Sequence, residues 1–246
     1  MIRAAVLVFG FACVAAAPEA HADTQWWVQH LRQLECTNSG DGYSAEVSIN
    51  GCNAIIRSNN AIGTVRADAY RHRGDRYREL GDLERALRDY SQAIRYNAEL
   101  APAYLRRAEI YLAQGNLEGA EADYARVIEI SPESPAGFSG RCRVRAIAGQ
   151  YDLARADCDA ALALRPTHAD SFANRGLISL RTGAYDAAYA DFDAAFANSR
   201  QPRYRYGRGV AALRLGRAEE GQEDIADAVE DDAGVAEIFA REGVAP

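Results

Sequence analysis

Apolar and small residues recur along the chain with the spacing of paired amphipathic helices. Between residues 67 and 231 the pattern returns every 34 residues, or 33 at the last step, and a glycine stands near the middle of each period. Residues three or four apart share one face of a helix, so each period predicts two helices joined at its glycine. The sequence therefore predicts an all-α chain with five helix pairs, which begin at about residues 67, 101, 135, 169 and 202.

The helix pairs share small residues at fixed places. A left-handed residue ends the first helix of each pair at little steric cost when it is glycine, which explains Gly81, Gly115, Gly149, Gly183 and Gly216. Small side chains also recur on first helices at Gly74, Ala108, Cys142, Gly176 and Gly209, and on second helices at Ala86, Ala120, Ala154, Ala188 and Gly221. These positions predict close contact between the two helices of each pair.

Together with aromatic residues, these positions form a pattern that resembles the tetratricopeptide repeat (TPR). The first copy has Tyr70, Arg73-Gly74, Tyr77, Gly81, Ala86, Asp89-Tyr90 and Ala93, and the second has Tyr104, Arg107-Ala108, Tyr111, Gly115, Ala120, Asp123-Tyr124, Val127 and Pro132. The resemblance implies a right-handed superhelical solenoid of helix hairpins. It also implies a surface that binds proteins or peptides without catalysis.

The segments on either side of the five repeats predict helices as well. Residues 23–66 are interpreted as a degenerate TPR-like helix pair, followed by an irregular connection over residues 59–65. Residues 232–246 predict a capping helix and tail, with the helix at about 233–241 and Val235, Ile238 and Phe239 on one side of it. A terminal repeat needs such a cap because it otherwise exposes an apolar face to water.

The first 22 residues have the features of a signal peptide. Arg3 precedes an apolar run from Ala4 to Ala17, and Ala20-His21-Ala22 fits a small-x-small cleavage site. The run is shorter than the roughly 20 residues that a membrane-spanning helix needs. We therefore expect cleavage after Ala22 and a periplasmic protein, with secretion as the alternative. The mature chain contains no other long apolar stretch and predicts no membrane span.

Cleavage would leave four cysteines, Cys36, Cys52, Cys142 and Cys158. Four cysteines allow three disulfide pairings, and an exported protein favours oxidised thiols. Cys36 and Cys52 are separated by 16 residues, as are Cys142 and Cys158, so the same local geometry would serve both pairs. We expect one disulfide within each of these two helix pairs; buried free thiols are the alternative.

Each of the five repeats contains an arginine and an aspartate at the same spacing. Each repeat has an Arg at its seventh position and an Asp sixteen residues later: Arg73 and Asp89, Arg107 and Asp123, Arg141 and Asp157, Arg175 and Asp191, Arg208 and Asp224. A partly buried guanidinium needs a carboxylate partner, so these residues predict structural ion pairs rather than a row of anion sites. The Asp could pair with the Arg of its own repeat or with that of the next.

Composition and motifs give no indication of catalysis. The net charge of -7 argues against a general nucleic-acid surface, which requires excess cation. The chain lacks the motifs of nucleophilic hydrolases, zinc proteases and phosphate loops, and its histidines are far apart. We expect no metal, no cofactor and no enzymatic activity.

The resemblance also indicates which residues would bind a partner. In TPR proteins the first helices line a concave groove, chiefly at their second, fifth, ninth, twelfth and thirteenth positions. Transferred to this chain, the groove residues are Arg71, Asp75, Leu105, Glu109, Leu112, Arg143, Leu177, Leu180, Arg181, Tyr206 and Leu213. The alternative for the leucines is support of neighbouring helices. The TPR clamp that grips chaperone C-termini is largely absent, because Arg71, Asp75, Arg106, Ala136 and Gly140 occupy its places.

The segment from Tyr206-Gly207-Arg208-Gly209 to Val235-Ala236-Glu237 and Phe239 resembles exported TPR proteins of Gram-negative bacteria. The functional hypothesis is an exported scaffold that binds a protein or peptide segment in its groove. The alternative is a structural or oligomerising component of a cell-envelope assembly or secretion machine. Homo-oligomers are compatible with both.

Overall fold

The structure is a computed structural model that describes residues 30–37, 42–59, 61–241 and 243–244. All regular structure in these ranges is helical, which confirms the predicted all-α class. The predicted signal peptide, residues 1–22, lies outside the described residues, as do the first seven residues of the helix expected from Asp23.

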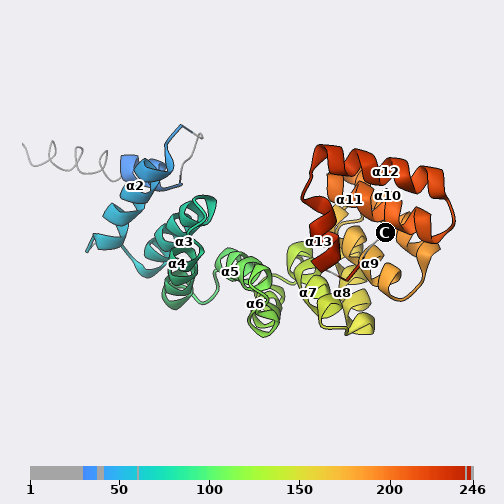
Figure 1. The fold of residues 1–246 in the computed structure, drawn as a ribbon. Coiled ribbons are helices and arrows are strands. Elements are labelled where there is room, and N and C mark those ends of the chain that lie inside the picture. Colours follow the sequence, from blue (N-terminus) through green and yellow to red (C-terminus); the bar gives the residue numbers. More distant parts are fainter. Residues whose placement is uncertain (1–29, 38–41, 60, 242, 245–246) are drawn as a thin grey trace, which may run out of the picture.

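The helices follow one another as antiparallel pairs (Figure 1). A helical segment at residues 30–37 precedes α2 (Ala45–Arg57). The five later pairs are α3 (Gly63–Glu79) with α4 (Leu83–Tyr96), α5 (Ala101–Ala113) with α6 (Leu117–Ile130), α7 (Pro135–Ile147) with α8 (Tyr151–Leu164), α9 (Ala169–Arg181) with α10 (Tyr185–Asn198), and α11 (Pro202–Arg214) with α12 (Ala218–Asp231). The last helix is α13 (Val235–Arg241). The predicted solenoid of helix hairpins is confirmed.

One element differs from its expected start. Helix α3 begins at Gly63, so residues 63–65 are helical rather than part of an irregular connection. Val65 packs against the cluster of Cys36, Cys52 and Ile55, and Arg66 Nη2 donates to the carbonyl of Ser58 at 2.8 Å. The extra helical turn is therefore held by tertiary contacts with the N-terminal pair, which no local pattern reveals.

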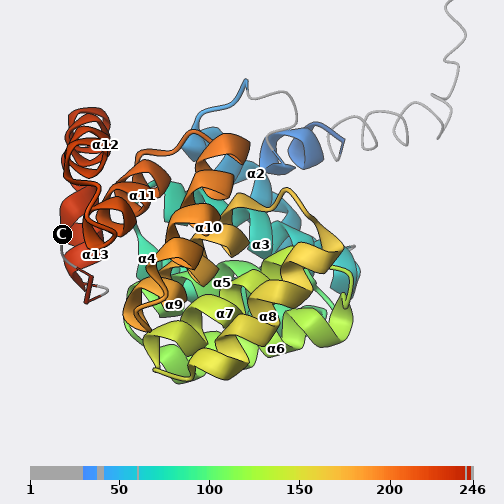
Figure 2. The same cartoon turned by 90° about the vertical axis from the view of Figure 1, so that its right-hand side faces the viewer.

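The pairs stack so that one set of helices faces inward. The first helices α3, α5, α7, α9 and α11 contact one another in succession, whereas the second helices α4, α6, α8, α10 and α12 show no comparable contacts with each other in the described part of the chain. First helices are therefore closer together, and the stack curves toward them, as the two views in Figures 1 and 2 show. The concave face of the solenoid is built from first helices.

The five turn glycines adopt the conformation that the pattern predicts. Their φ angles lie between 76° and 78°, in the left-handed region that L side chains rarely adopt. No atom lies within 4 Å of a Cβ built on any of them, so the backbone conformation alone requires glycine. The turns thus fix the antiparallel arrangement of each pair.

A buried ion pair joins the two helices of each repeat. Arg107 Nε and Nη2 donate to the two carboxylate oxygens of Asp123, each at 2.8 Å. The same forked arrangement joins Arg73 to Asp89, Arg141 to Asp157, Arg175 to Asp191 and Arg208 to Asp224. These carboxylates are 4–7% exposed. The structure therefore pairs each Arg with the Asp of its own repeat.

The third guanidinium nitrogen reaches the preceding repeat. Arg175 Nη1 donates to Asp159 at 2.6 Å, Arg107 Nη1 to Ser91 at 3.0 Å, and Arg73 Nη1 to Asn53. The third repeat is an exception, because Ala125 stands at the corresponding place of α6. Each ladder arginine elsewhere binds its own hairpin and the preceding one in the stack.

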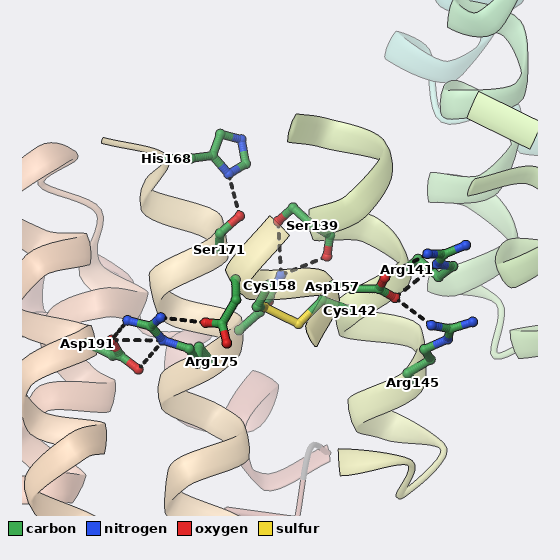
Figure 3. Close-up of a disulfide and its surroundings, with 12 residues drawn as sticks. Ser139, Arg141, Cys142, Arg145, Asp157, Cys158, His168, Ser171, Arg175 and Asp191 are labelled. Atoms are coloured by element: carbon green, nitrogen blue, oxygen red, sulfur yellow. Dashed lines mark hydrogen bonds and ion pairs between the residues drawn. A yellow bond between two sulfur atoms is a disulfide. The ribbon is translucent and has the colours of Figure 1, made fainter. Parts of the chain in front are cut away.

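In the third repeat Arg145 takes over the link between hairpins. Its Nη1 donates to Asp157 at 2.9 Å and its Nε to Glu121 of α6 at 2.8 Å. Asp157 therefore accepts hydrogen bonds from two guanidinium groups (Figure 3).

Disulfides close two of the helix pairs. The sulfur atoms of Cys142 and Cys158 are bonded across α7 and α8, next to the Arg141–Asp157 pair (Figure 3). Cys36 and Cys52 are bonded in the same way across the N-terminal pair. All four cysteines are at most 2% exposed. The structure supports the two local pairings that the equal spacing favours.

Candidate functional site

The concave face is hollowed over the middle of the solenoid. A pocket of about 360 Å³ opens between α5, α7, the start of α9 and the start of α11. Leu105, Leu112 and Ile147 supply its apolar wall, and Glu109, Arg143, Asp170 and Arg203 supply charge. Its volume falls in the range of sites that hold a small molecule or a side chain of a partner.

Small residues on α7 create this pocket. Ser139 and Gly140 occupy the fifth and sixth positions of α7, where α11 has Tyr206 and Gly207. A Cβ on Gly140 would lie 2.1 Å from Cε1 of Tyr124, so the tyrosine ring fills the space beside the glycine. The ring forms part of the pocket lining.

The pocket's two carboxylates already have cationic partners. Glu109 lies 3.1 Å from Arg106 Nη1 and 3.6 Å from Arg78 Nη1. Asp170 accepts hydrogen bonds from Arg203 and, at 2.6 Å, from the hydroxyl of Tyr204. Burial alone would raise the pKa of Asp170, but the Tyr204 hydrogen bond and the charge of Arg203 hold it below its ordinary value. Asp170 is therefore ionised at neutral pH.

His168 and Asn174 lie at the α9 side of the pocket. Burial lowers the pKa of His168, whose Nδ1 is 2.8 Å from the hydroxyl of Ser171. Asn174 is buried and its amide donates to the carbonyl of Ser139 at 3.1 Å, which ties α9 to α7. The sequence analysis predicted neither residue as part of the site. For Asn174 a signal was available, because it stands at the position that Arg106 and Gly140 occupy in the two preceding repeats.

Four predicted groove residues line the main pocket and two lie beside it. Leu105, Glu109, Leu112 and Arg143 are in the lining. Leu177 and Arg181 border a narrow extension between α7 and α9, in which Arg181 Nη1 donates to the carbonyl of Ala146 at 2.7 Å. The structure thus brings together residues from three repeats at one place on the concave face.

Two further predicted groove residues pair with each other away from this pocket. Arg71 Nη1 donates to Asp75 at 3.0 Å on α3, and the hydroxyl of Tyr90 donates to Asp75 at 2.8 Å. This cluster satisfies its own polar groups.

Two predicted groove residues are buried, and a third packs toward a second helix. Leu180 is 8% exposed and part of the C-terminal core. Leu213 packs toward α12, where a Cβ on Gly221 would lie 2.8 Å from it. Tyr206 is 2% exposed, because the ring of Phe239 covers it at a centroid distance of 4.8 Å. For Leu180 and Tyr206, the predicted role as accessible groove residues is wrong. Leu213 is half-buried, and its groove role stays a prediction.

Helix α13 accounts for the burial of Tyr206. It lies against α11, as both views show, and buries Val235 and Phe239 (Figures 1 and 2). Ile238 was expected on the same buried side but is 38% exposed, since it borders a small cavity with Arg143 and Leu177. The last helix therefore covers the fifth repeat and also reaches the edge of the concave site.

The described ranges contain no candidate metal site and no candidate membrane span. No group of three or more His, Cys, Asp and Glu side chains could hold a metal ion there. Within the same ranges, no helix is both long enough and apolar enough to cross a bilayer. What remains is a preformed surface with apolar and charged parts. The fold and this surface define a helical-repeat scaffold of the kind that binds other proteins.

Sequence comparison supports a particular repeat family. The family profile described as tetratricopeptide repeat matches residues 71–135 and 148–202. These two ranges therefore carry the TPR sequence pattern, in agreement with the repeats that the structure shows. Proteins of this family are in general non-catalytic interaction scaffolds. No curated protein matches the chain significantly.

Solved TPR structures resemble the chain in fold. A tetratricopeptide repeat protein from Parabacteroides merdae ATCC 43184 has a TM-score of 0.69 and 18% identity, over 83% of this chain and 80% of that one. A thermophilic TPR protein of Thermus thermophilus has a TM-score of 0.61 and 21% identity, over 72% and 97%. YrrB, described as a TPR protein with an unusual peptide-binding site, has a TM-score of 0.53 and 20% identity, over 74% of this chain and 92% of that one.

Proposed function

We propose that this protein is an exported TPR scaffold that binds a protein or peptide segment in its concave groove. The pocket between α5, α7, α9 and α11 carries the proposal, because it places apolar and charged side chains on one accessible surface. YrrB, which is described as having an unusual peptide-binding site, offers a structural parallel. Binding of this kind is reversible recognition on a preformed surface and requires no covalent chemistry.

Export is part of the same proposal. Two disulfides are stable in an oxidising compartment, and residues 1–22 have the pattern of a cleaved signal peptide. The mature protein would consist of the N-terminal helix pair at 23–66, five repeats over 67–231 and the C-terminal helix and tail at 232–246. Its compartment would be the periplasm or, alternatively, the cell exterior.

Affinity capture from periplasmic extract tests this function. The processed chain is compared with a groove variant, Leu105→Ala/Leu112→Ala, and with a matched variant of the outer helix α8, Leu153→Ala/Leu164→Ala. Leu153 and Leu164 are 53% and 43% exposed, so their loss leaves the groove unchanged. We expect a partner that the wild-type chain and the α8 variant retain and the groove variant loses. Loss only with the α8 variant would instead support an assembly role through the outer face.

A further inference from the structure

Charge is distributed unevenly between the two sets of helices. The first helices, α3, α5, α7, α9 and α11, contain 16 arginines and five acidic residues. The second helices, α4, α6, α8, α10 and α12, contain five arginines and 19 acidic residues. The ladder pairs only five of the first-helix arginines with second-helix aspartates. Arginine therefore stays in excess on the helices that build the concave face, although the net charge of the whole chain is -7.

Arg78 and Arg106 share one carboxylate beside the pocket. Glu109, which lines the pocket, lies 3.1 Å from Arg106 Nη1 and 3.6 Å from Arg78 Nη1. The distance from Arg78 is longer than a hydrogen bond, and Arg78 donates no hydrogen bond to any residue in the described part of the chain. Its side chain is 35% exposed. A carboxylate from outside can therefore reach Arg78 and accept the hydrogen bonds that its terminal nitrogens offer.

Arg143 of α7 supplies a further cation to the pocket. It lines the main pocket, and it also borders the narrow extension between α7 and α9 and the small cavity beside α13. The other carboxylate in the lining, Asp170, is bound by Arg203 and by the Tyr204 hydroxyl. The arginines in and next to the pocket thus outnumber its carboxylates, and the apolar wall lies on the same accessible surface.

We propose that the groove binds an acidic segment of a protein partner, with Asp or Glu side chains on Arg78 and Arg143 and apolar side chains against Leu105 and Leu112. A guanidinium binds a carboxylate through paired, charge-assisted hydrogen bonds. The positive concave surface also attracts an acidic segment before contact is made. Aliphatic side chains in the lining suit a peptide better than the stacked bases of a nucleic acid. The inference rests on the proposed groove function and specifies the chemistry of the partner.

Peptides selected from a random dodecapeptide library on phage, with the full chain as the target, provide the probe. They are synthesised with both ends blocked, so that no terminal carboxylate takes part, and binding is measured by fluorescence anisotropy. We expect peptides rich in Asp and Glu, and replacing these residues by Asn and Gln should weaken binding at least about tenfold. Raising the salt concentration from about 0.05 M to about 0.3 M should also weaken binding, because salt screens exposed charges.

A matched pair of variants tests the location of the acidic residues. Arg78→Gln removes a cation that donates no hydrogen bond to a described residue, and should weaken peptide binding at least about tenfold. Arg143→Gln should have a similar effect. The control Arg88→Gln removes the same charge from the exposed side of α4 and should leave affinity within about twofold. If a variant loses its helical circular dichroism, the peptide replacements and the salt dependence still decide the question.

Other occupants of the groove give different results. Selected peptides that lack acidic residues, yet lose binding in Leu105→Ala/Leu112→Ala, would overturn this inference and leave the groove function standing. Tighter binding of single-stranded oligothymidine than of the acidic peptides would also overturn it. So would self-association of the chain that Arg78→Gln abolishes, because the occupant would then be a second copy. A selection without any groove-dependent peptide would contradict both the inference and the groove function.

Discussion

The interior of each hairpin and the first-helix positions of the concave face differ in how far their residues recur from repeat to repeat. Inside, the same Arg–Asp fork recurs in all five repeats with N–O distances that differ by only a few tenths of an ångström, from 2.7 Å for Arg73–Asp89 to 3.0 Å for Arg175–Asp191. The ninth position of the first helices differs at every repeat: it holds Asp75, Glu109, Arg143 and Leu177 in turn, and then Val210, which is buried. The recurring residues hold each hairpin together, whereas the varied residues give each repeat a different side chain at this position.

Removal of a ladder carboxylate should have the largest effect. Asp157→Ala leaves Arg141 and Arg145 without their buried acceptor, because Asp157 is 5% exposed and bonded to both. We expect a loss of about 4 kcal/mol in the free energy of unfolding, measured by urea denaturation. The control is Glu129→Ala, an exposed partner of Arg126, which should change stability by less than about 0.5 kcal/mol. Equal effects would show that the ladder is not structural.

The third hairpin allows a comparison of covalent and ionic closure. Cys142→Ala/Cys158→Ala removes a disulfide between residues separated by 16 positions, and should lower the free energy of unfolding by about 3 kcal/mol. Cys36→Ala/Cys52→Ala opens a loop of the same length in the N-terminal pair, and chain entropy predicts a similar loss. A much smaller loss in the N-terminal pair would mean that this pair unfolds before the repeats.

The turns should contribute less than the buried pairs. Gly183→Ala forces an L side chain into a conformation with φ of 77° and should cost about 1 kcal/mol in thermal or urea unfolding. Gly63→Ala is a suitable control, because Gly63 is at the start of α3 and its φ is not in the left-handed region. That control should be neutral or slightly stabilising; destabilisation of both variants to the same extent would contradict the role of φ.

The smallest effect on stability should come from the protonation of His168, which lines the pocket on the concave face. Burial lowers the pKa of His168 in the folded state, so the unfolded chain binds its proton first as pH falls below the ordinary value of 6.5. Stability should therefore decrease as pH falls from 7 toward 5. His168→Gln should flatten that part of the stability curve, measured by urea unfolding at several pH values. An unchanged slope would exclude His168 as a contributor.

The sequence predicted features that repeat and missed features that depend on distant contacts. Turn glycines such as Gly115 and ion-pair partners such as Arg107 recur at fixed spacing, so the fold class was readable from periodicity. The burial of Tyr206 was not readable, since it follows from the position of α13 and the ring of Phe239. Position within a TPR helix therefore indicates which side chains face the groove, but a neighbouring helix decides which of them are accessible.

The candidate pocket also contains a residue that the repeat positions did not predict. Leu105 and Arg143 were predicted because their positions repeat, whereas Tyr124 belongs to a second helix and reaches the pocket only because Gly140 leaves room. Its signal in the sequence was a glycine at the sixth position of a first helix, which becomes meaningful only once the two helices are seen side by side.

The disulfides have a mechanical consequence. Each lies within one hairpin, so neither restrains the angle between successive hairpins. Under tension applied to its two ends, the solenoid can open at the junctions between repeats while the third hairpin remains closed. The disulfide prevents the segment between Cys142 and Cys158 from extending. At about 3.5 Å per residue, the fully stretched chain is therefore roughly 50 Å shorter than it would be without this disulfide. The molecule therefore has two covalent links, each within a single helix pair, that tension cannot lengthen.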